Sequence, residues 1–393
     1  MDLESGYFDK FMELMYMTNM IKRKYDIVDF IKPQKVLVIF GPRRVGKTTL
    51  LNDFLSRTTL KFKLDSGDNI QIQQVLSSQD FRQILDYAAG YELIAIDEAQ
   101  QIPNIGMGLK ILVDQMPNLI VIATGSSAFD LSGAIGEPLT GRKTTVVLYP
   151  LAQLELLNLY NSFELRAKLE DFLIYGSYPE IVTANTSRDK IALLEEVVNS
   201  YLLKDVLKLD RIKGAKLLLD LLKLLAFQIG SQVSLNELAT QLRIDVKTVG
   251  RYLDIFEKAF VIKRIGGFSR NLRSEVVSKA KYYFLDNGIR NAVISQFNSI
   301  DNRNDIGQLW ENFLVTERLK KCTYQALYGT FYFWRTYAGQ ELDWVEEREG
   351  RLLGYEFKWS GKKRRKQPKD WLKAYGNAEF QMVNRKNYME FIL

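Results

Sequence analysis

The sequence predicts an α/β protein built on a parallel sheet, followed by a helical region and a second α/β region. Three observations lead to this prediction. Apolar runs alternate with stretches of helical spacing over residues 36–151, as in parallel sheets whose strands are buried on both faces. A glycine-rich loop follows the first apolar run and opens the first helix. Beyond residue 151 the pattern becomes strongly helical, and alternating strands return near the C-terminus.

Composition limits the chemistry of the chain. Its 393 residues suit two or three domains, and 54 Lys and Arg against 47 Asp and Glu give a net charge of +7. This mildly basic balance permits a nucleic-acid partner without requiring one. Histidine is absent, which excludes a histidine general base and histidine zinc ligands. Catalysis must therefore depend on carboxylates, lysine, arginine, hydroxyls and a metal bound through oxygen.

The sequence favours an intracellular, soluble protein. Cys322 is the single cysteine, so no internal disulfide forms and a reducing compartment is the simpler interpretation. The opening MDLESGYFDK lacks the apolar core of a signal peptide. The leucine-rich stretch 217–227 is too short for a membrane span and carries Asp220 and Lys223. We therefore expect a cytoplasmic location and no membrane partner.

The first 151 residues contain five candidate strands. A short helical lead-in reaches about residue 35, and helices are expected from Lys47 and over 77–89. The candidate strands are 36–40, 60–65, 93–97, 119–127 and 144–151.

A phosphate-binding loop follows the first strand. Residues 41–48, GPRRVGKT, match G-x-x-x-x-G-K-[ST] in full between a strand and a helix. Such glycines let successive backbone N–H groups face phosphate oxygens. Lys47 is expected to reach the β- and γ-phosphates of ATP, and Thr48 to offer its hydroxyl to Mg²⁺. The predicted nucleotide-binding residues are Gly41, Pro42, Arg43, Arg44, Val45, Gly46, Lys47, Thr48 and Thr49.

Two further strand ends supply candidate catalytic groups. The strand LIAID ends in Asp97, which is expected to hold the metal, and Glu98 is expected to orient or deprotonate the attacking water. Ser126, with Thr124 as second choice, is a candidate sensor of the γ-phosphate; the alternative is an ordinary polar strand end. Arg142 is a candidate arginine finger for its own ATP or a neighbouring subunit's, or else a solvated loop residue.

Residues 213–300 have the pattern of a winged helix-turn-helix. Ser234 and Asp245 are expected to cap two short helices, and two extended segments follow. Lys247, Thr248 and Arg251 would face outward from the second helix, where they suit contacts with DNA. A protein-interaction module or a rigid connector is the alternative.

Residues 301–393 carry a third constellation, Glu311, Asp343, Glu356 and Lys358. Asp343 and Glu356 could bind a second metal, and Lys358 lies on the same strand face as Glu356. The alternative is an ordinary charged pair on a sheet. Two other features are interpreted more simply. The basic run 362–369 is either a phosphate patch or a solvated loop, and core packing is expected for Trp334, Trp344 and Trp359.

These motifs resemble, in order and over nearly the whole chain, the prokaryotic AAA-type ATPases that carry a C-terminal DUF4143 domain. The motifs are GPRRVGKTTLL, IDEAQ, TGSSAFDL, LTGRK with YPL, GSYPEIV and YLLKDVL. The resemblance implies an AAA+-like core, a winged-helix middle and a restriction-endonuclease-like PD-(D/E)xK domain. The expected units are 1–151 for the ATPase core, 152–212 for a helical lid, 213–300 for the winged helix and 301–393 for the nuclease-like domain.

Three functions remain open at this point. The first is ATP binding and hydrolysis coupled to nucleic-acid binding or processing, with ATP and Mg²⁺ as ligands and DNA as a candidate partner. The second is an ATP-dependent protein-interaction switch whose nuclease-like domain is catalytically silent. The third is a toxin- or defence-type nuclease controlled by its nucleotide state. A homo-oligomer is compatible with each of them.

Overall fold

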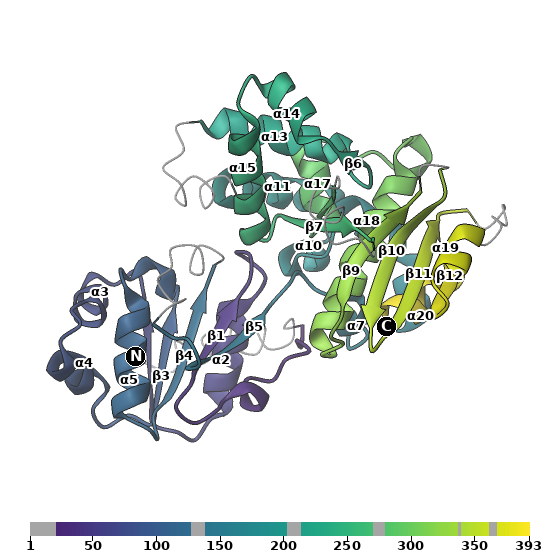
Figure 1. Ribbon diagram of the computed structural model, residues 1–393. Helices are drawn as coiled ribbons and strands as arrows, with labels where there is room; N and C mark the ends of the chain where they lie inside the picture. Colours follow the sequence, from purple (N-terminus) through teal and green to yellow (C-terminus); the bar gives the residue numbers. More distant parts are fainter. Residues whose placement is uncertain (1–20, 127–137, 203–213, 270–279, 337–338, 361–367) are drawn as a thin grey trace.

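The chain forms two sheets connected by helices, as Figure 1 shows. This architecture is seen in a computed structural model, which describes residues 21–126, 138–202, 214–269, 280–336, 339–360 and 368–393. The five-stranded sheet and its helices lie apart from the seven-stranded sheet, and the helical region lies between and above them in this view.

The N-terminal sheet is entirely parallel, with strand order β2-β3-β4-β1-β5. Its strands are β1 Val36–Phe40, β2 Phe62–Ser66, β3 Leu93–Asp97, β4 Ile120–Gly125 and β5 Lys143–Val147. All five predicted strands are therefore confirmed, with ends shifted by a few residues. Because β4 lies between β1 and β3, the chain segments that follow these three strands meet at one edge of the sheet.

Alternation along β1 explains why this sheet is buried on both faces. Val36, Val38 and Phe40 belong to one hydrophobic group, whereas Leu37 and Ile39 belong to another. Successive side chains of a strand point to opposite faces, so each group covers one side. Fully burying such a side chain stabilises the fold by about 1.5–3 kcal/mol.

The helices of this domain are α2 Lys47–Arg57, α3 Ile70–Ser77, α4 Phe81–Ala88 and α5 Ile105–Gln115. The helix predicted over 77–89 begins later, because Asp80 accepts hydrogen bonds from two backbone amides and acts as the N-cap of α4. Gln79 has a positive φ of 59° and separates this helix from α3. The predicted lead-in contains only a short 3₁₀ turn, η1 Ile27–Phe30, among the described residues.

A helical region follows Leu151, as predicted. Its elements are α7 Gln153–Leu156, α8 Ser162–Ala167, α9 Leu169–Tyr175, α10 Pro179–Thr183, α11 Ser187–Glu196 and the π-helical segment η3 Val197–Leu202. Buried leucines and aromatic residues of α9 pack on the helices that come later in the chain.

The middle region contains the two short helices and the two extended segments that the sequence predicted. They are α14 Leu235–Leu242, α15 Val246–Lys258, β7 Ile262–Gly267 and β8 Ala280–Phe284. The region also contains α13 Ala215–Phe227, β6 Gln232–Val233 and α17 Asn287–Val293, which were not predicted from the sequence. Ser234 caps α14 by accepting from the Glu237 amide, and Asp245 caps α15 by accepting from the Thr248 amide. Both caps satisfy otherwise free helix amides.

The C-terminal region consists of α18 Ile306–Tyr324, β9 Thr330–Arg335, β10 Glu341–Arg348, β11 Arg351–Lys358, α19 Lys369–Ala374, β12 Ala378–Asn384 and α20 Tyr388–Ile392. Its strands join those of the middle region in one sheet of order β12-β11-β10-β9-β7-β8-β6. The joint is the short parallel pairing of Gly266 with Tyr332 and Gly267 with Phe333. The expected division at residue 300 therefore falls inside a structure that shares a continuous sheet.

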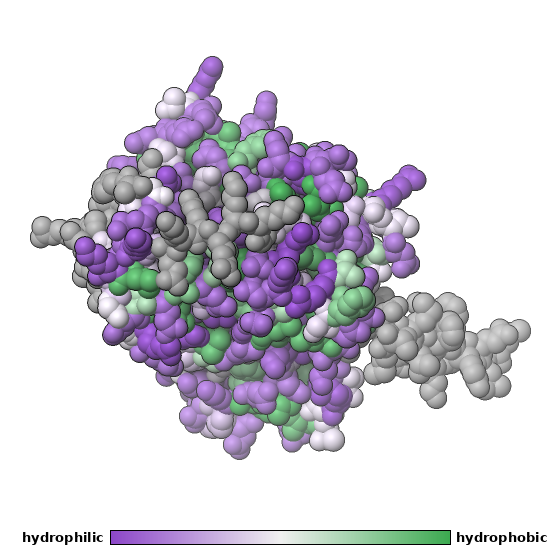
Figure 2. Space-filling view, turned by 90° about the vertical axis from the view of Figure 1, so that its right-hand side faces the viewer, coloured by the Kyte–Doolittle hydropathy of each residue, from purple (hydrophilic) through white to green (hydrophobic). Residues whose placement is uncertain are grey.

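One face of the molecule shows no extended apolar patch among the described residues (Figure 2). On the face in Figure 2, hydrophilic residues predominate and hydrophobic residues form small separate groups. Large exposed apolar patches usually mark association sites. None of the helices in the described part of the chain is long and apolar enough to cross a membrane.

Candidate functional site

The phosphate-binding loop turns tightly between β1 and α2. Gly46 has a φ of 94° and precedes the first residue of α2, and its carbonyl accepts the first helical hydrogen bond from Leu50 at 2.9 Å. A Cβ on Gly41 would stand 2.1 Å from the Leu148 carbonyl oxygen. Both positions therefore require glycine, one for its dihedral angle and one for the close approach of another backbone segment.

Lys47 lies inside this loop. Its side chain is 4% exposed, and its ammonium donates to the Gly41 and Pro42 carbonyls at 2.9 Å each. These bonds hold a positive charge against the turn at the start of α2. A helix N-terminus already attracts anions through its free amides, so the ammonium adds to a site that suits phosphate.

Asp97 connects the loop to two strands. Its Oδ2 accepts from the Thr48 hydroxyl at 2.8 Å, and its Oδ1 accepts from the Thr124 hydroxyl. The two predicted magnesium ligands, Thr48 and Asp97, are thus in direct contact. Thr124 is fully buried, and this bond holds the carboxylate at the carboxyl edge of the sheet.

Glu98 lies beside this pair, one residue beyond the end of β3. Its backbone has a positive φ of 51°, and its amide donates to the Thr124 hydroxyl at 3.3 Å. The Gln100 side-chain amide donates to the Glu98 carboxylate. Gln100 was not among the predicted site residues; the only signal for it is its place two residues after Glu98 in the same motif.

Ser126 follows β4 at the same edge. Its side chain is 1% exposed, and its hydroxyl has no hydrogen-bond partner among the described residues. Its backbone amide donates to the Gln100 side-chain oxygen at 3.3 Å. Because buried polar groups are nearly always paired, this hydroxyl is available for a bound ligand or water. Thr124, the second choice as sensor of the γ-phosphate, instead donates its hydroxyl hydrogen bond to Asp97.

These residues fit a magnesium-bound nucleoside triphosphate. The turn and Lys47 supply positive charge for phosphates, while Thr48 and Asp97 supply the hard oxygen ligands that Mg²⁺ prefers. The unpaired Ser126 hydroxyl is a buried group at this edge that a ligand would satisfy.

Arg142 lies elsewhere. Its carbonyl accepts from the Val36 amide at the start of β1, so it sits at the amino edge of the sheet, whereas the loop follows the carboxyl end of β1. Its guanidinium pairs with Asp114 at 2.5 Å. The hypothesis that Arg142 acts on ATP bound to its own chain is therefore wrong, because a five-residue strand of about 3.3 Å per residue separates the two edges.

Two arginines tie the loop to the rest of the chain. Arg44 pairs with Glu180 of α10 at 3.0 Å and with Glu196 of α11 at 2.5 Å. Arg23 donates to the Val45 carbonyl at 2.5 Å and pairs with Glu155 at 2.9 Å. Neither contact was predicted, since the partners are more than 20 residues apart in sequence.

Arg23 also reaches the C-terminal region. Its guanidinium donates to the Tyr324 hydroxyl at 3.0 Å and to the Tyr149 carbonyl at 2.7 Å. Burial lowers the pKa of Arg23, but the attraction of Tyr324 and Glu155 more than offsets it and raises the pKa above its usual value. The group is charged at every physiological pH and links the loop, the helical region and α18.

The predicted C-terminal constellation is organised around a lysine that the sequence did not single out. Lys281 of β8 is 1% exposed, and its ammonium lies 3.0 Å from Glu311, 2.8 Å from Glu341 and 3.8 Å from Asp343. The Tyr283 hydroxyl donates to Glu311 at 2.7 Å. Burial lowers the pKa of Lys281, but the three carboxylates raise it overall.

Glu356 and Lys358 form a separate pair. Glu356 is 3% exposed and lies 2.9 Å from the Lys358 ammonium, on the same face of β11 as predicted. Asp343 accepts from the Phe357 amide at 2.7 Å, and burial followed by the Glu311 charge raises the pKa of Asp343 to about 7. In the described part of the chain, no group of three or more Asp, Glu, His or Cys side chains is arranged to hold a metal ion. The acids pair with lysines instead, and the second metal site stays a prediction.

Other predicted residues have structural roles or lie outside the described residues. Lys363, Arg364, Arg365 and Lys366 fall outside them, as does part of YLLKDVL. In GSYPEIV, the Ser177 amide donates to the buried Asp286 carboxylate at 2.7 Å. Lys320 donates to the Ser177 hydroxyl at 3.1 Å and pairs with Glu317 at 2.7 Å. This motif therefore fastens the helical region to α17 and α18.

Comparisons with known families cover most of the chain in three pieces. Residues 33–157 match an AAA domain, residues 166–300 a domain of unknown function (DUF8612), and residues 306–390 a domain of unknown function (DUF4143). The first match contains the loop and the Asp97 edge. The second spans most of the helical region together with the middle region.

Similar proteins occur in bacteria and archaea. An uncharacterized protein of Mycobacterium tuberculosis is 29% identical over 327 residues, which cover 82% of this chain and 70% of that protein. An uncharacterized protein of Methanocaldococcus jannaschii is 25% identical over 384 residues, which cover 92% of this chain and 83% of that protein. Domain III of the Thermotoga maritima replication initiation protein DnaA aligns over 45% of this chain and 83% of that chain, with 17% identity and a TM-score of 0.26.

The matched families agree with the geometry of the loop, the Asp97 edge and the β4 strand between them. Residues 33–157 match an AAA domain and residues 306–390 a DUF4143 domain, which supports an AAA-type ATPase with a C-terminal DUF4143 domain, and the parallel sheet with its glycine-rich loop fits a P-loop core.

Proposed function

We propose that this chain binds Mg²⁺–ATP at the loop 41–48 and hydrolyses it, and that hydrolysis is coupled to nucleic-acid binding. The contact of Asp97 with Thr48 and Thr124 carries the first part, because it brings the loop and two strand ends into one site. The AAA domain match over residues 33–157 supports the same conclusion at the level of the family.

Each residue has a distinct task in this proposal. Lys47 moves from the Gly41 and Pro42 carbonyls to the β- and γ-phosphates, whose charge it neutralises. Thr48 and Asp97 hold Mg²⁺, which stabilises the charge that develops on the phosphate oxygens. Glu98 accepts a proton from the attacking water, and Ser126 donates its unpaired hydroxyl to the γ-phosphate.

Arg44 and Arg23 would transmit the nucleotide state from the loop to the regions that follow it. Phosphate binding draws the loop amides inward, and Arg44 connects this loop to α10 and α11 through two carboxylates. Arg23 connects the Val45 carbonyl to Tyr324 of α18. A shift of the loop therefore changes contacts in both following regions.

Exposed basic residues on α15 support nucleic acid as the client. Lys247 and Arg251 are exposed and four residues apart, so they share one face of the helix. Thr248, predicted beside them, uses its hydroxyl to bond the capping Asp245. We assign phosphate contacts to the two cations only.

DNA is expected to stimulate ATP turnover at low salt, and the stimulation should fall steeply as salt is added. The measurement is ATP hydrolysis by the full chain with and without duplex and single-stranded DNA, between about 50 and 200 mM salt. Replacing both Lys247 and Arg251 with alanine should remove most of the stimulation. The matched control, Lys32→Ala with Arg82→Ala, removes the same charge from exposed positions of the ATPase core. DNA binding absent at low salt would favour a protein client instead.

A second candidate function is favoured by Lys281. Its ammonium lies between the acids that a nuclease would use to hold a metal. This arrangement supports a nuclease-like domain that is catalytically silent, within an ATP-dependent protein-interaction switch. Both candidates share the ATPase site and differ only in the client.

Replacing Lys281 with methionine tests this second candidate. Three partly buried carboxylates would then lose their buried cation, so unfolding free energy should fall by about 3–5 kcal/mol. Mn²⁺ without nucleotide should restore part of this loss in the variant and leave wild-type melting unchanged. The control is Lys263→Met, which breaks a more exposed pair with Glu257 and should cost at most about 1 kcal/mol. Metal-dependent cleavage of nucleic acid by the wild-type chain, lost in Glu356→Ala, would show that the domain is not silent.

A further inference from the structure

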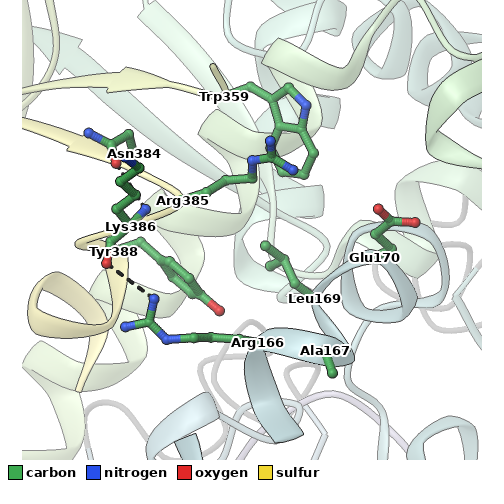
Figure 3. A pocket seen from close by; sticks show the side chains of 9 residues that line it. All are labelled: Arg166, Ala167, Leu169, Glu170, Trp359, Asn384, Arg385, Lys386 and Tyr388. Atoms are coloured by element: carbon green, nitrogen blue, oxygen red, sulfur yellow. Dashed lines mark hydrogen bonds between the residues drawn. The ribbon is translucent and has the colours of Figure 1, made fainter. Parts of the chain in front are cut away.

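A cavity of about 360 Å³ lies between the helical region and the C-terminal sheet. Arg166 and Glu170 line it from α8 and α9, and Trp359, Arg385 and Tyr388 line it from the opposite side (Figure 3). Its size is within the range of roughly 300–1,000 Å³ that is usual for small-molecule sites, and far above what a bare phosphate requires. It is remote in sequence from the loop 41–48 and shares no residue with it.

The cavity is basic. Arg166, Arg385 and Lys386 line it, against Glu170 as the one acidic lining residue. Among the described residues, none of these three cations forms an ion pair with a carboxylate. The Arg166 guanidinium instead donates to the Lys386 backbone carbonyl at 3.1 Å, the bond drawn in Figure 3. Three cations against one carboxylate give the cavity a positive balance, which favours an anionic ligand.

Its walls are aromatic. The Arg385 guanidinium lies 4.5 Å from the centre of the Trp359 ring, and Arg166 lies 5.8 Å from the centre of the Tyr388 ring. Trp310 packs edge-on against both rings, at 5.5 Å and 5.3 Å between centres. A guanidinium held over a fixed indole presents a flat cationic face on which a base can stack.

Tyr388 provides an independent sign of a ligand. Its side chain is 1% exposed, yet its hydroxyl has no hydrogen-bond partner among the described residues. Figure 3 shows this hydroxyl directed into the cavity, near Arg166 and Leu169. Burial raises the pKa of Tyr388 to about 12, so the group keeps its proton at neutral pH and can donate.

The position in the sheet also suits a ligand. β11 and β12 run parallel, with Lys358 opposite Asn384 at their carboxyl ends. Trp359 and Arg385 directly follow the ends of the two strands. Ligands of open α/β sheets bind beyond the carboxyl ends of parallel strands, where chain segments diverge.

We propose that this cavity binds a nucleoside monophosphate unit, either free or as part of a single-stranded nucleic acid. Arg166, Lys386 and the Tyr388 hydroxyl contact the phosphate, and the base stacks on the Arg385 guanidinium. Trp359, expected from sequence to serve packing alone, holds that guanidinium in place. A ligand here touches both the helical region and the C-terminal region.

The test is calorimetric titration of the full chain carrying Lys47→Ala, so that the loop 41–48 contributes little. The probes are 5′-AMP, ribose 5-phosphate and a short single-stranded oligodeoxynucleotide. AMP should bind at least about tenfold more tightly than ribose 5-phosphate, because base stacking is worth about 1–3 kcal/mol per base. Arg385→Ala should remove this preference, and Arg82→Ala, an exposed arginine of the ATPase core, should leave it unchanged.

Tyr388→Phe is the sharper variant, because it deletes an unpaired hydroxyl and should leave the melting temperature unchanged or raised. It should weaken AMP binding about tenfold, the worth of one hydrogen bond to a charged group. If the oligonucleotide binds more tightly than AMP, with a steep salt dependence, the ligand is a single-stranded nucleic acid. If AMP binds more tightly than the oligonucleotide, the ligand is the free nucleotide. No binding of either at low salt, or binding that Tyr388→Phe and Arg385→Ala leave intact, overturns the proposal. These titrations need no ATP turnover, so they stand apart from the ATPase test.

Discussion

Lys47→Ala is expected to abolish ATP hydrolysis by this chain, with turnover reduced by at least about 10²–10³-fold. The ammonium of Lys47 is the one buried cation in the loop that faces the start of α2, and its charge offsets that of the β- and γ-phosphates. Alanine keeps the helix but leaves the phosphates without this charge. Turnover is measured as phosphate release, and binding with a fluorescent ATP analogue, which should also be lost.

The control for this prediction is Lys32→Ala, an exposed lysine of the same domain. It changes the net charge equally and should leave turnover as in the wild type. Melting curves of both variants separate loss of the site from loss of the fold. Turnover near the wild-type rate in Lys47→Ala would contradict the assignment of the loop.

Glu98→Gln is expected to retain ATP while slowing hydrolysis by about 10²–10⁴-fold, the usual contribution of a general base. Glutamine has the same shape and can still accept from Gln100 through its carbonyl oxygen, so the local geometry survives. It cannot accept the proton of the attacking water. Single-turnover assays should show bound, uncleaved ATP in this variant.

Glu92→Gln is the matched control, since Glu92 is an exposed carboxylate that precedes β3 at its other end. It should hydrolyse ATP as the wild type does. If Glu98→Gln also hydrolyses at the wild-type rate, another group activates the water and the proposed role is wrong. If it fails to bind ATP, Glu98 serves the site as a structural residue.

Much of the ATPase site follows from local sequence. A strand, a glycine-rich turn and a helix are adjacent in the chain, so the contacts of Lys47 with Gly41 and Pro42 span six residues or fewer. Asp97 lies at a strand end, and parallel strands present their carboxyl ends at one edge. The meeting of Thr48 with Asp97 could therefore be predicted, although 49 residues separate them.

Arg142 shows what such reasoning misses. Its motif is adjacent to a strand, and its role depends on which end of that strand it occupies. The parallel pairing of β5 with β1 puts it at the amino edge, paired with Asp114. No periodicity in the sequence carries that information, because it requires knowing where β5 enters the sheet.

The sequence by itself determined the strands, the helix caps, the phosphate-binding loop and the order of the acidic residues, since each depends on neighbours along the chain. Only the tertiary structure decided that Lys281 neutralises Glu311 and Asp343, that one sheet joins the middle and C-terminal regions, and that Arg385 and Tyr388 face Arg166 across a cavity. The physical reason is that these contacts join segments 28 to more than 200 residues apart. Which residues pair depends on how whole helices and strands pack together, and the spacing of residues along the sequence does not predict that packing.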